Sequence, residues 1–169
     1  MFQDEARFGL ISEPRRVWAP PGIRPEVPVQ IVRQYSYAYA AVSPHDGVLD
    51  SLVLPDVNAE RMSLFLAAVA QRHADEFIVM VLDGAGWHTA GDLTVPERMR
   101  LQPLPPWSPQ LNPVEHLWEE VREKWMGNYL FANLQAVERQ LVRGLISLER
   151  NRRQVASLTG FRWIRRIPL

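Results

Sequence analysis

A short, continuously apolar run in the middle of the chain restricts the fold more than any other segment. Phe77-Ile-Val-Met-Val-Leu82 follows charged residues and is followed by Asp83-Gly-Ala-Gly86. A run of this length without polar alternation is typical of a β-strand covered on both faces, and covering both faces requires further layers on each side of a sheet. The run therefore predicts an α/β domain. It is far too short for a membrane span, which needs about 18 or more apolar residues.

Local patterns along the rest of the chain predict the other elements. Apolar and polar residues alternate at the start of the chain, as in a half-buried strand, and β-branched and aromatic residues mark the next two strands. Asparagines stand where segments with helical apolar periodicity begin, as N-cap residues do. The expected elements are strands at Met1–Gly9, Val29–Val42 and Val48–Leu54, a helix from Asn58 to about His73, strands at Phe77–Leu82 and about Met99–Leu104, a helix from Asn112 to about Met126, and a helix from Asn133 through Leu148.

These elements predict a single α/β domain over residues 1–169. The first three strands are expected to be antiparallel neighbours and the later strands to follow crossovers, which gives a mixed five-stranded sheet flanked by helices. Between the first two strands, Ser12 to Pro28 is rich in proline and predicts a long irregular loop that carries Trp18. No basic and apolar leader precedes the first strand, so we expect no signal peptide.

The cysteine and charge content restrict the chemistry. The chain has no cysteine, which excludes thiolate nucleophiles and metal sites built on thiolates. Its 19 basic and 19 acidic side chains balance, which argues against non-specific coating of nucleic acid. From Arg139 to the end, however, there are eight arginines and one glutamate, and Arg150, Arg152 and Arg153 are candidates for binding DNA phosphates. A solvated face, or a GC-rich genome, explains the same pattern equally well.

Two aspartates stand where a carboxylate needs a partner. Asp4 shares the apolar face of the first strand with Phe2 and Ala6, so its charge calls for a partner such as a metal ion. A solvated position near a frayed terminus is the alternative. Asp83 ends the apolar strand beside two glycines, which lets a ligand approach the backbone beyond the carboxyl end of the strand. A turn-forming Asp-Gly is the alternative there.

Glu115 is the third candidate acid. It is the third helical residue after Asn112, where a glutamate either bonds back to the cap, as in a capping box, or presents a metal ligand from a rigid helix start. Glu119 lies one turn further along the same face and is the substitute candidate. His88 is expected to bond a DNA phosphate or the carboxylates, or else to be structural. His116 is expected to be a neighbour of the helix N-terminus and not a ligand.

The three acids indicate the kind of metal and reaction. Two aspartates and a glutamate, with no cysteine and no histidine cluster, favour Mg²⁺ or Mn²⁺ over zinc. Two such ions about 3.5–4 Å apart can activate the attacking oxygen and stabilise the leaving oxygen of a phosphodiester. The acids therefore predict phosphoryl chemistry.

Four segments together resemble the catalytic domain of DDE transposases of the mariner-like superfamily, in particular its bacterial insertion-sequence branch. The resemblance implies a ribonuclease-H-like fold in which Asp4, Asp83 and Glu115 hold two Mg²⁺ ions, for which Mn²⁺ can substitute, with Asp4 bridging them. The last segment is the most specific. In chain order the segments are Gln3-Asp4-Glu5-Ala-Arg-Phe8, Arg16-Val-Trp18-Ala-Pro-Pro-Gly22, Val81-Leu-Asp83-Gly-Ala-Gly-Trp-His88 and Trp107-Ser-Pro-Gln-Leu-Asn-Pro-Val-Glu115-His-Leu-Trp118.

The same resemblance implies a function and partners. Such enzymes cut the ends of a mobile element with water and then join the freed 3′-hydroxyl to target DNA. The implied partners are both DNAs, a second copy of the chain reached by the loop around Trp18, and an upstream polypeptide with the helix-turn-helix modules that this chain lacks. The implied location is the bacterial cytoplasm, at the nucleoid. Two rival hypotheses stay open: an inactive remnant that binds DNA or an intact subunit as an inhibitor, and a ribonuclease-H-like host nuclease.

Overall fold

A mixed five-stranded sheet forms the centre of the computed structural model, which describes residues 1–12, 14–88 and 91–166. Its strand order is β3-β2-β1-β4-β5. β1 pairs antiparallel with β2 and β2 antiparallel with β3, whereas β4 is parallel to both β1 and β5. The predicted sheet of three antiparallel strands followed by parallel strands is therefore confirmed. The strands are β1 (Phe2–Ile11), β2 (Ile31–Ser43), β3 (Val48–Leu54), β4 (Ile78–Leu82) and β5 (Met99–Pro103).

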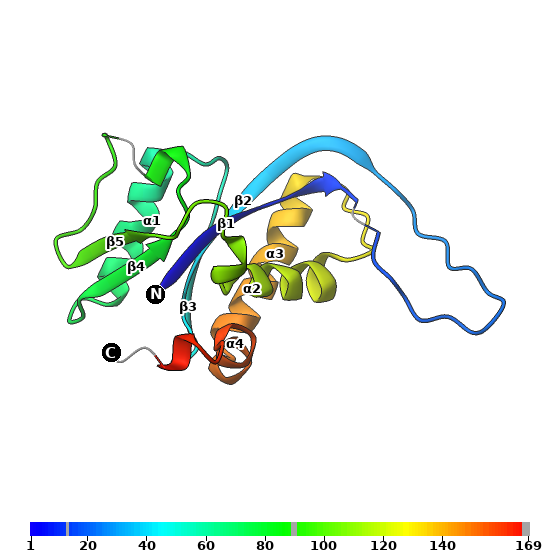
Figure 1. Ribbon diagram of the computed structural model, residues 1–169. Helices are drawn as coiled ribbons and strands as arrows, with labels where there is room; N and C mark the ends of the chain where they lie inside the picture. The colour runs from blue at the N-terminus through cyan, green and yellow to red at the C-terminus, as the bar shows by residue number, and fades with distance from the viewer. Residues whose placement is uncertain (13, 89–90, 167–169) are drawn as a thin grey trace.

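Helices cover the two faces of the sheet unequally (Figure 1). α1 lies on one face and packs Met62, Phe65 and Leu66 against Tyr39 and Met80. The other three helices pack over β1, β2 and β3 on the opposite face, where their apolar residues form the larger core. The helices are α1 (Ala59–Arg72), α2 (Val114–Val121), α3 (Leu134–Glu149) and α4 (Arg152–Thr159), with short helical turns at Gly86–His88, Pro109–Leu111, Arg122–Met126 and Ile164–Arg166.

The burial of two strands differs from the prediction. β1 was expected to be half-buried, and Arg7 on its second face is exposed, but near its start, between β2 and β4, that face is covered as well, so that Gln3 is 0% exposed. β4 was expected to be covered on both faces, but Val79 is 46% exposed. The reason is that α2, α3 and α4 pack over the antiparallel half of the sheet and cover only part of that face of β4, where Val81 packs against the larger core and Val79 stays exposed.

The helical part of the chain also differs in detail from the prediction. α4 was not predicted, because the polar residues Arg152, Arg153 and Gln154 at its start obscure its apolar periodicity. The helix expected from Asn112 begins at Val114, after Pro113 in the cap position, and its last turn to Met126 is π-helical. The helices capped by Asn58 and Asn133 are confirmed: each asparagine side chain accepts a hydrogen bond from the third following backbone N–H.

A long loop projects from the body of the domain between β1 and β2 (Figure 1). Hydrogen bonds close its base, since Ser12 N donates to the Gln30 carbonyl at 2.9 Å and Gln30 N donates to Ser12 Oγ at 3.0 Å. Trp18 within it is fully exposed. The irregular loop predicted around Trp18 is therefore present. Across the described part of the chain, no helix combines the length and apolar character needed to cross a membrane.

We expect Gly47→Ala to destabilise the protein by more than about 1 kcal/mol, measured by urea unfolding. Gly47 has φ of +72° in the β2–β3 turn, and a Cβ there would overlap the backbone carbonyl of Arg152 at the start of α4. Gly22→Ala is the control, because Gly22 also has positive φ, +85°, but has no atoms within 4 Å of the added Cβ. If the two variants lose the same free energy of unfolding, the close approach of Gly47 to α4 contributes nothing to the destabilisation.

Candidate active site

A cavity of about 470 Å³ lies where the segments after β4 and β5 meet β1 and the start of α2. Asp4, Asp83 and Glu115 all line it, and the chain between β5 and α2 forms most of the rest of its wall. The sheet register explains why both aspartates reach this cavity. Phe2 pairs with Val81 across the parallel strands, so Asp4 and Asp83, each two residues further along, both line the space where the strands separate.

Asp4 is a largely buried carboxyl group in the middle of the fold. Trp118 Nε1 on α2 donates a hydrogen bond of 2.9 Å to Asp4 Oδ2. Burial, with the nearby Glu115 carboxylate, raises the pKa of Asp4 to about 7 despite this bond. The alternative of a frayed terminus is wrong, because the Met1 ammonium group donates to the Val79 carbonyl at 2.7 Å and β1 begins at Phe2.

Asn112 fixes the position of Glu115 relative to β1. The buried Asn112 side chain donates to the Gln3 carbonyl at 2.9 Å and accepts from Val114 N at 3.2 Å, which ties the start of α2 to the central strand. In the capping-box alternative, the Glu115 side chain would accept a hydrogen bond from the backbone N–H of Asn112. That N–H donates instead to the Pro109 carbonyl at 2.8 Å. Glu115 therefore lines the cavity beside Asp4.

His88 connects Asp83 to a further acid. Its Nδ1 lies 2.9 Å from Asp83 Oδ1, and its Nε2 lies 3.1 Å from Glu5 Oε1. Burial lowers the pKa of His88, but the hydrogen bonds to the two carboxylates outweigh this effect and raise it to about 10. The hydrogen bond from His88 lowers the pKa of Asp83. The sequence left open whether His88 bonds carboxylates or a DNA phosphate, and in the structure it bonds carboxylates. At 5% exposure, the residue is not placed to meet a DNA phosphate.

Glu5 is a site residue that the sequence reasoning missed. The alternation in β1 placed it on the face opposite Asp4, and no role was expected there. Its side chain is only 6% exposed and accepts hydrogen bonds from Trp87 Nε1 at 3.3 Å and from His88 at 3.1 Å. The signal was present in the Asp-Glu pair at the start of the chain, because a second acid inside a covered strand also needs a partner.

Of the three predicted acids, Asp4 and Glu115 interact electrostatically, whereas Asp83 is bonded to His88. Among the described residues, no three Asp, Glu, His or Cys side chains lie close enough to form a metal site. The donor set still fits a hard divalent cation, because a buried carboxyl beside a second carboxylate is an arrangement that such a cation relieves, and every donor is oxygen.

The remaining sequence candidates lie outside the cavity lining. Glu119 is exposed on α2, and the ring of His116 packs edge-on against Phe161 with centroids 4.9 Å apart. The arginines expected to bind DNA phosphates are exposed at the α3–α4 junction, and Arg152 lies beside the β2–β3 turn. These arginines are Arg150, Arg152 and Arg153.

Comparison with known sequences finds relatives. The sequence profile of the family described as DDE superfamily endonuclease matches residues 1–138. An uncharacterized protein of Sinorhizobium fredii (strain NBRC 101917 / NGR234), y4pE/y4sA, is 41% identical over 98 residues, which are 57% of this chain and 73% of that protein.

Comparison with solved structures finds the same fold in Mos1 transposase. The TM-score is 0.59 with the Mos1 paired-end complex with left transposon end, at 17% identity, and 0.60 with the Mos1 strand transfer complex, also at 17%. With the Mos1 mariner paired-end complex with Mn it is 0.60, at 18% identity. Each match covers 95% of this chain, which spans about half the length of the Mos1 chains. The likeness confirms the predicted ribonuclease-H-like fold.

We expect Asp4→Asn to stabilise the metal-free protein at pH 8 by on the order of 1–3 kcal/mol and to have little effect at pH 4. The pKa of Asp4 is about 7 in the folded protein and near 3.8 in the unfolded chain, so the folded state binds the proton more tightly. The wild type therefore loses stability as pH rises from about 4 to 7, whereas the amide does not titrate.

Urea unfolding in EDTA at the two pH values measures this difference. Asp75→Asn is the matched control, because Asp75 is exposed and lies outside the cavity lining, and this variant should lose stability between the two pH values as the wild type does. A wild type as stable as Asp4→Asn at pH 8 would contradict the electrostatic account of the cavity.

Proposed function

We propose that this chain, which belongs to the DDE superfamily endonucleases, catalyses metal-dependent cleavage and transfer of DNA strands in transposition. The observation that carries the proposal is that Asp4 and Glu115, from a central strand and a helix start, interact in one cavity whose wall also contains Asp83. We propose that residues 1–169 form a single domain that supplies the catalytic part of a transposase.

The carboxylates of the cavity are the proposed ligands of two Mg²⁺ or Mn²⁺ ions. Asp4 would contact both ions, and Asp83 and Glu115 one each. Bound ions of this kind polarise the phosphodiester and lower the pKa of an attacking water. Crystal structures of Mos1 paired-end complexes with Mn and with Mg support this choice of metals.

The chain's own residues prepare these carboxylates. Trp118 orients Asp4 through its indole N–H, and Asn112 fixes the helix start that carries Glu115. His88 keeps Asp83 ionised, and Glu5 balances the charge of the histidine. The surrounding groups therefore maintain two differently ionised aspartates in the wall of one cavity, one kept charged and one easily protonated.

The proposed partners are DNA and a second copy of the chain. The Mos1 paired-end complex with left transposon end supports DNA as the ligand. The exposed Arg150, Arg152 and Arg153 would contact its phosphates, and the projecting loop with its exposed Trp18 would contact the second copy. We propose that end recognition comes from helix-turn-helix modules on a separate polypeptide, and that the protein acts at the bacterial nucleoid.

A second candidate is an inactive remnant that binds DNA or an intact subunit without cutting. The observation that favours it is the position of Asp83, whose Oδ1 accepts hydrogen bonds from His88 and from Ala85 N, at 2.9 and 3.0 Å. In the part of the chain that the structure describes, no three ligands are gathered for a metal. The two candidates differ in whether a metal ion draws Asp83 to Asp4 and Glu115.

Asp83→Asn and Glu115→Gln should each lower Mn²⁺-dependent strand transfer at least about 100-fold while DNA affinity changes little. The assay supplies pre-cut transposon ends, or the upstream polypeptide in trans, because end recognition is proposed to lie elsewhere. Glu119→Gln, on the exposed face of α2, is the control and should retain activity. Product that persists in Asp83→Asn would refute the assignment of the acids. No product from the wild type, with no Mn²⁺ uptake by calorimetry, would establish the remnant.

Replacing Arg150, Arg152 and Arg153 together by glutamine should weaken DNA binding and reduce its salt dependence. The log–log slope should fall by up to about 0.9 for each DNA phosphate that is no longer neutralised. Fluorescence anisotropy from 50 to 200 mM salt measures both quantities. The matched control replaces three other exposed arginines, Arg24, Arg33 and Arg100. If the wild type binds one DNA sequence tightly and this binding persists at high salt, the proposal that end recognition lies on another polypeptide is contradicted.

A further inference from the structure

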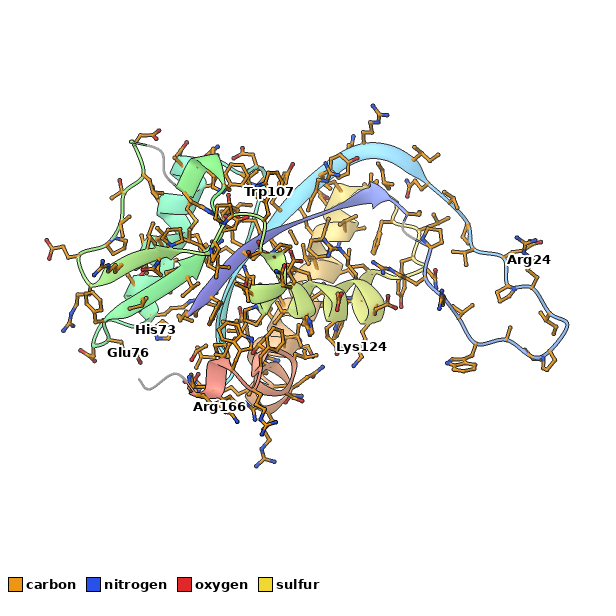
Figure 2. The ribbon with its side chains drawn as sticks, in the orientation of Figure 1. Arg24, His73, Glu76, Trp107, Lys124 and Arg166 are labelled. Carbon is orange, nitrogen blue, oxygen red and sulfur yellow. The ribbon has the colours of Figure 1, made fainter. Side chains whose placement is uncertain are left out.

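Trp107 combines two unfavourable features at the wall of the cavity. Its side chain, labelled in Figure 2, is 97% exposed. Its backbone φ is 58°, in the left-handed region that bulky residues rarely adopt. A bulky residue held there is strained, and such outliers concentrate at functional sites. Trp118, by contrast, is 1% exposed and packs in the core. Trp107 therefore contributes little packing that offsets its backbone strain.

The segment that carries Trp107 is fixed at both sides. Leu104 N donates to the Leu82 carbonyl at 2.7 Å, which holds the segment beside β4, and the Asn112 side chain donates to the Gln3 carbonyl at 2.9 Å, which holds it beside β1. Prolines restrict φ between these points. They are Pro105, Pro106 and Pro109, and all three line the cavity. The indole is thus presented on a stiff support.

The charge of the cavity defines what the indole can do for a DNA strand. The described lining residues include the three acids Asp4, Asp83 and Glu115 but no arginine, lysine or histidine. A polyanionic strand is repelled by these carboxylates, so attraction by the protein in the cavity has to come from a contact that is not ionic. A nucleobase stacked on an aromatic ring supplies about 1–3 kcal/mol and requires no charge.

We propose that Trp107 stacks on a nucleobase beside the phosphodiester that enters the cavity, and so positions the strand against the three acids. This inference rests on the proposed function, because it takes DNA as the substrate. It makes Trp107 a substrate-contacting residue, distinct from the carboxylates that hold the ions. The left-handed backbone is then the conformation that keeps the ring out of the core and available to the base.

The test compares Trp107→Gly, Trp107→Phe and the wild type. A short single-stranded DNA with 2-aminopurine reports stacking by fluorescence quenching, and anisotropy reports affinity, with no need for cleavage. We expect Trp107→Gly to lose the quenching and to bind about 5- to 150-fold more weakly, the equivalent of the stacking energy, and Trp107→Phe to retain part of both. Because glycine accepts positive φ, the urea midpoint of Trp107→Gly should rise.

Phe77→Gly is the control, since Phe77 is an exposed aromatic residue just before β4, outside the cavity lining and without a proposed binding role, and it should keep the quenching. If the wild type binds DNA and Trp107→Gly binds equally well, the stacking proposal alone is overturned. A lowered urea midpoint would make Trp107 structural and overturn it too. Loss of self-association in ultracentrifugation with unchanged DNA affinity would assign the ring to a second copy and overturn it. A wild type that binds no DNA would refute the proposed function itself.

Discussion

The burial of the Asp4 carboxyl group beside a second carboxylate is the constraint on which the rest of the structure depends. Asp4 lies on the central strand, where burial and Glu115 oppose its ionisation. Such a pair persists only because the surrounding fold holds it: α2 is tied to β1 through Asn112 and Trp118. Natural proteins keep arrangements of this kind at sites where function requires them and the remaining core supplies the stability. In this chain that core is the packing of α2, α3 and α4 on the antiparallel half of the sheet.

Local patterns in the sequence predict the elements well but their burial poorly. The strands, the helices capped by Asn58 and Asn133, and the mixed sheet follow from periodicity and cap chemistry, which are local. The exposure of Val79 and the burial of Gln3 depend on which helix lies over each strand, and this is decided by contacts between distant segments. α4 was missed because its first turn is polar, although Asn151 caps it by accepting a hydrogen bond from Gln154 N.

The site shows the same division between local and distant information. The positions of Asp83 at a strand end and Glu115 at a helix start are local, so the sequence predicted them as candidates. The choice between a capping box and a cavity residue for Glu115 depended on one hydrogen bond, which Asn112 N gives to Pro109. The link from Glu5 through His88 to Asp83 joins residues about 80 positions apart, as the contacts Trp87–Glu5 and His88–Glu5 show. No spacing rule contains such a link.

The topology explains why a cavity forms at this place. β1 is bonded to β2 along most of its length but pairs with β4 only at Phe2, so beyond that point the two strands separate. Ligands of α/β sheets bind where neighbouring connections leave in different directions at the carboxyl ends of strands. The chain after β4 brings Asp83 and His88 to this gap, and the chain after β5 brings Trp107 and Glu115. The connection after β4 and the connection after β5 therefore both reach Asp4 in β1. This places three carboxylates that are distant in the sequence around one cavity, and the proline-rich segment between β5 and α2 forms its outer wall.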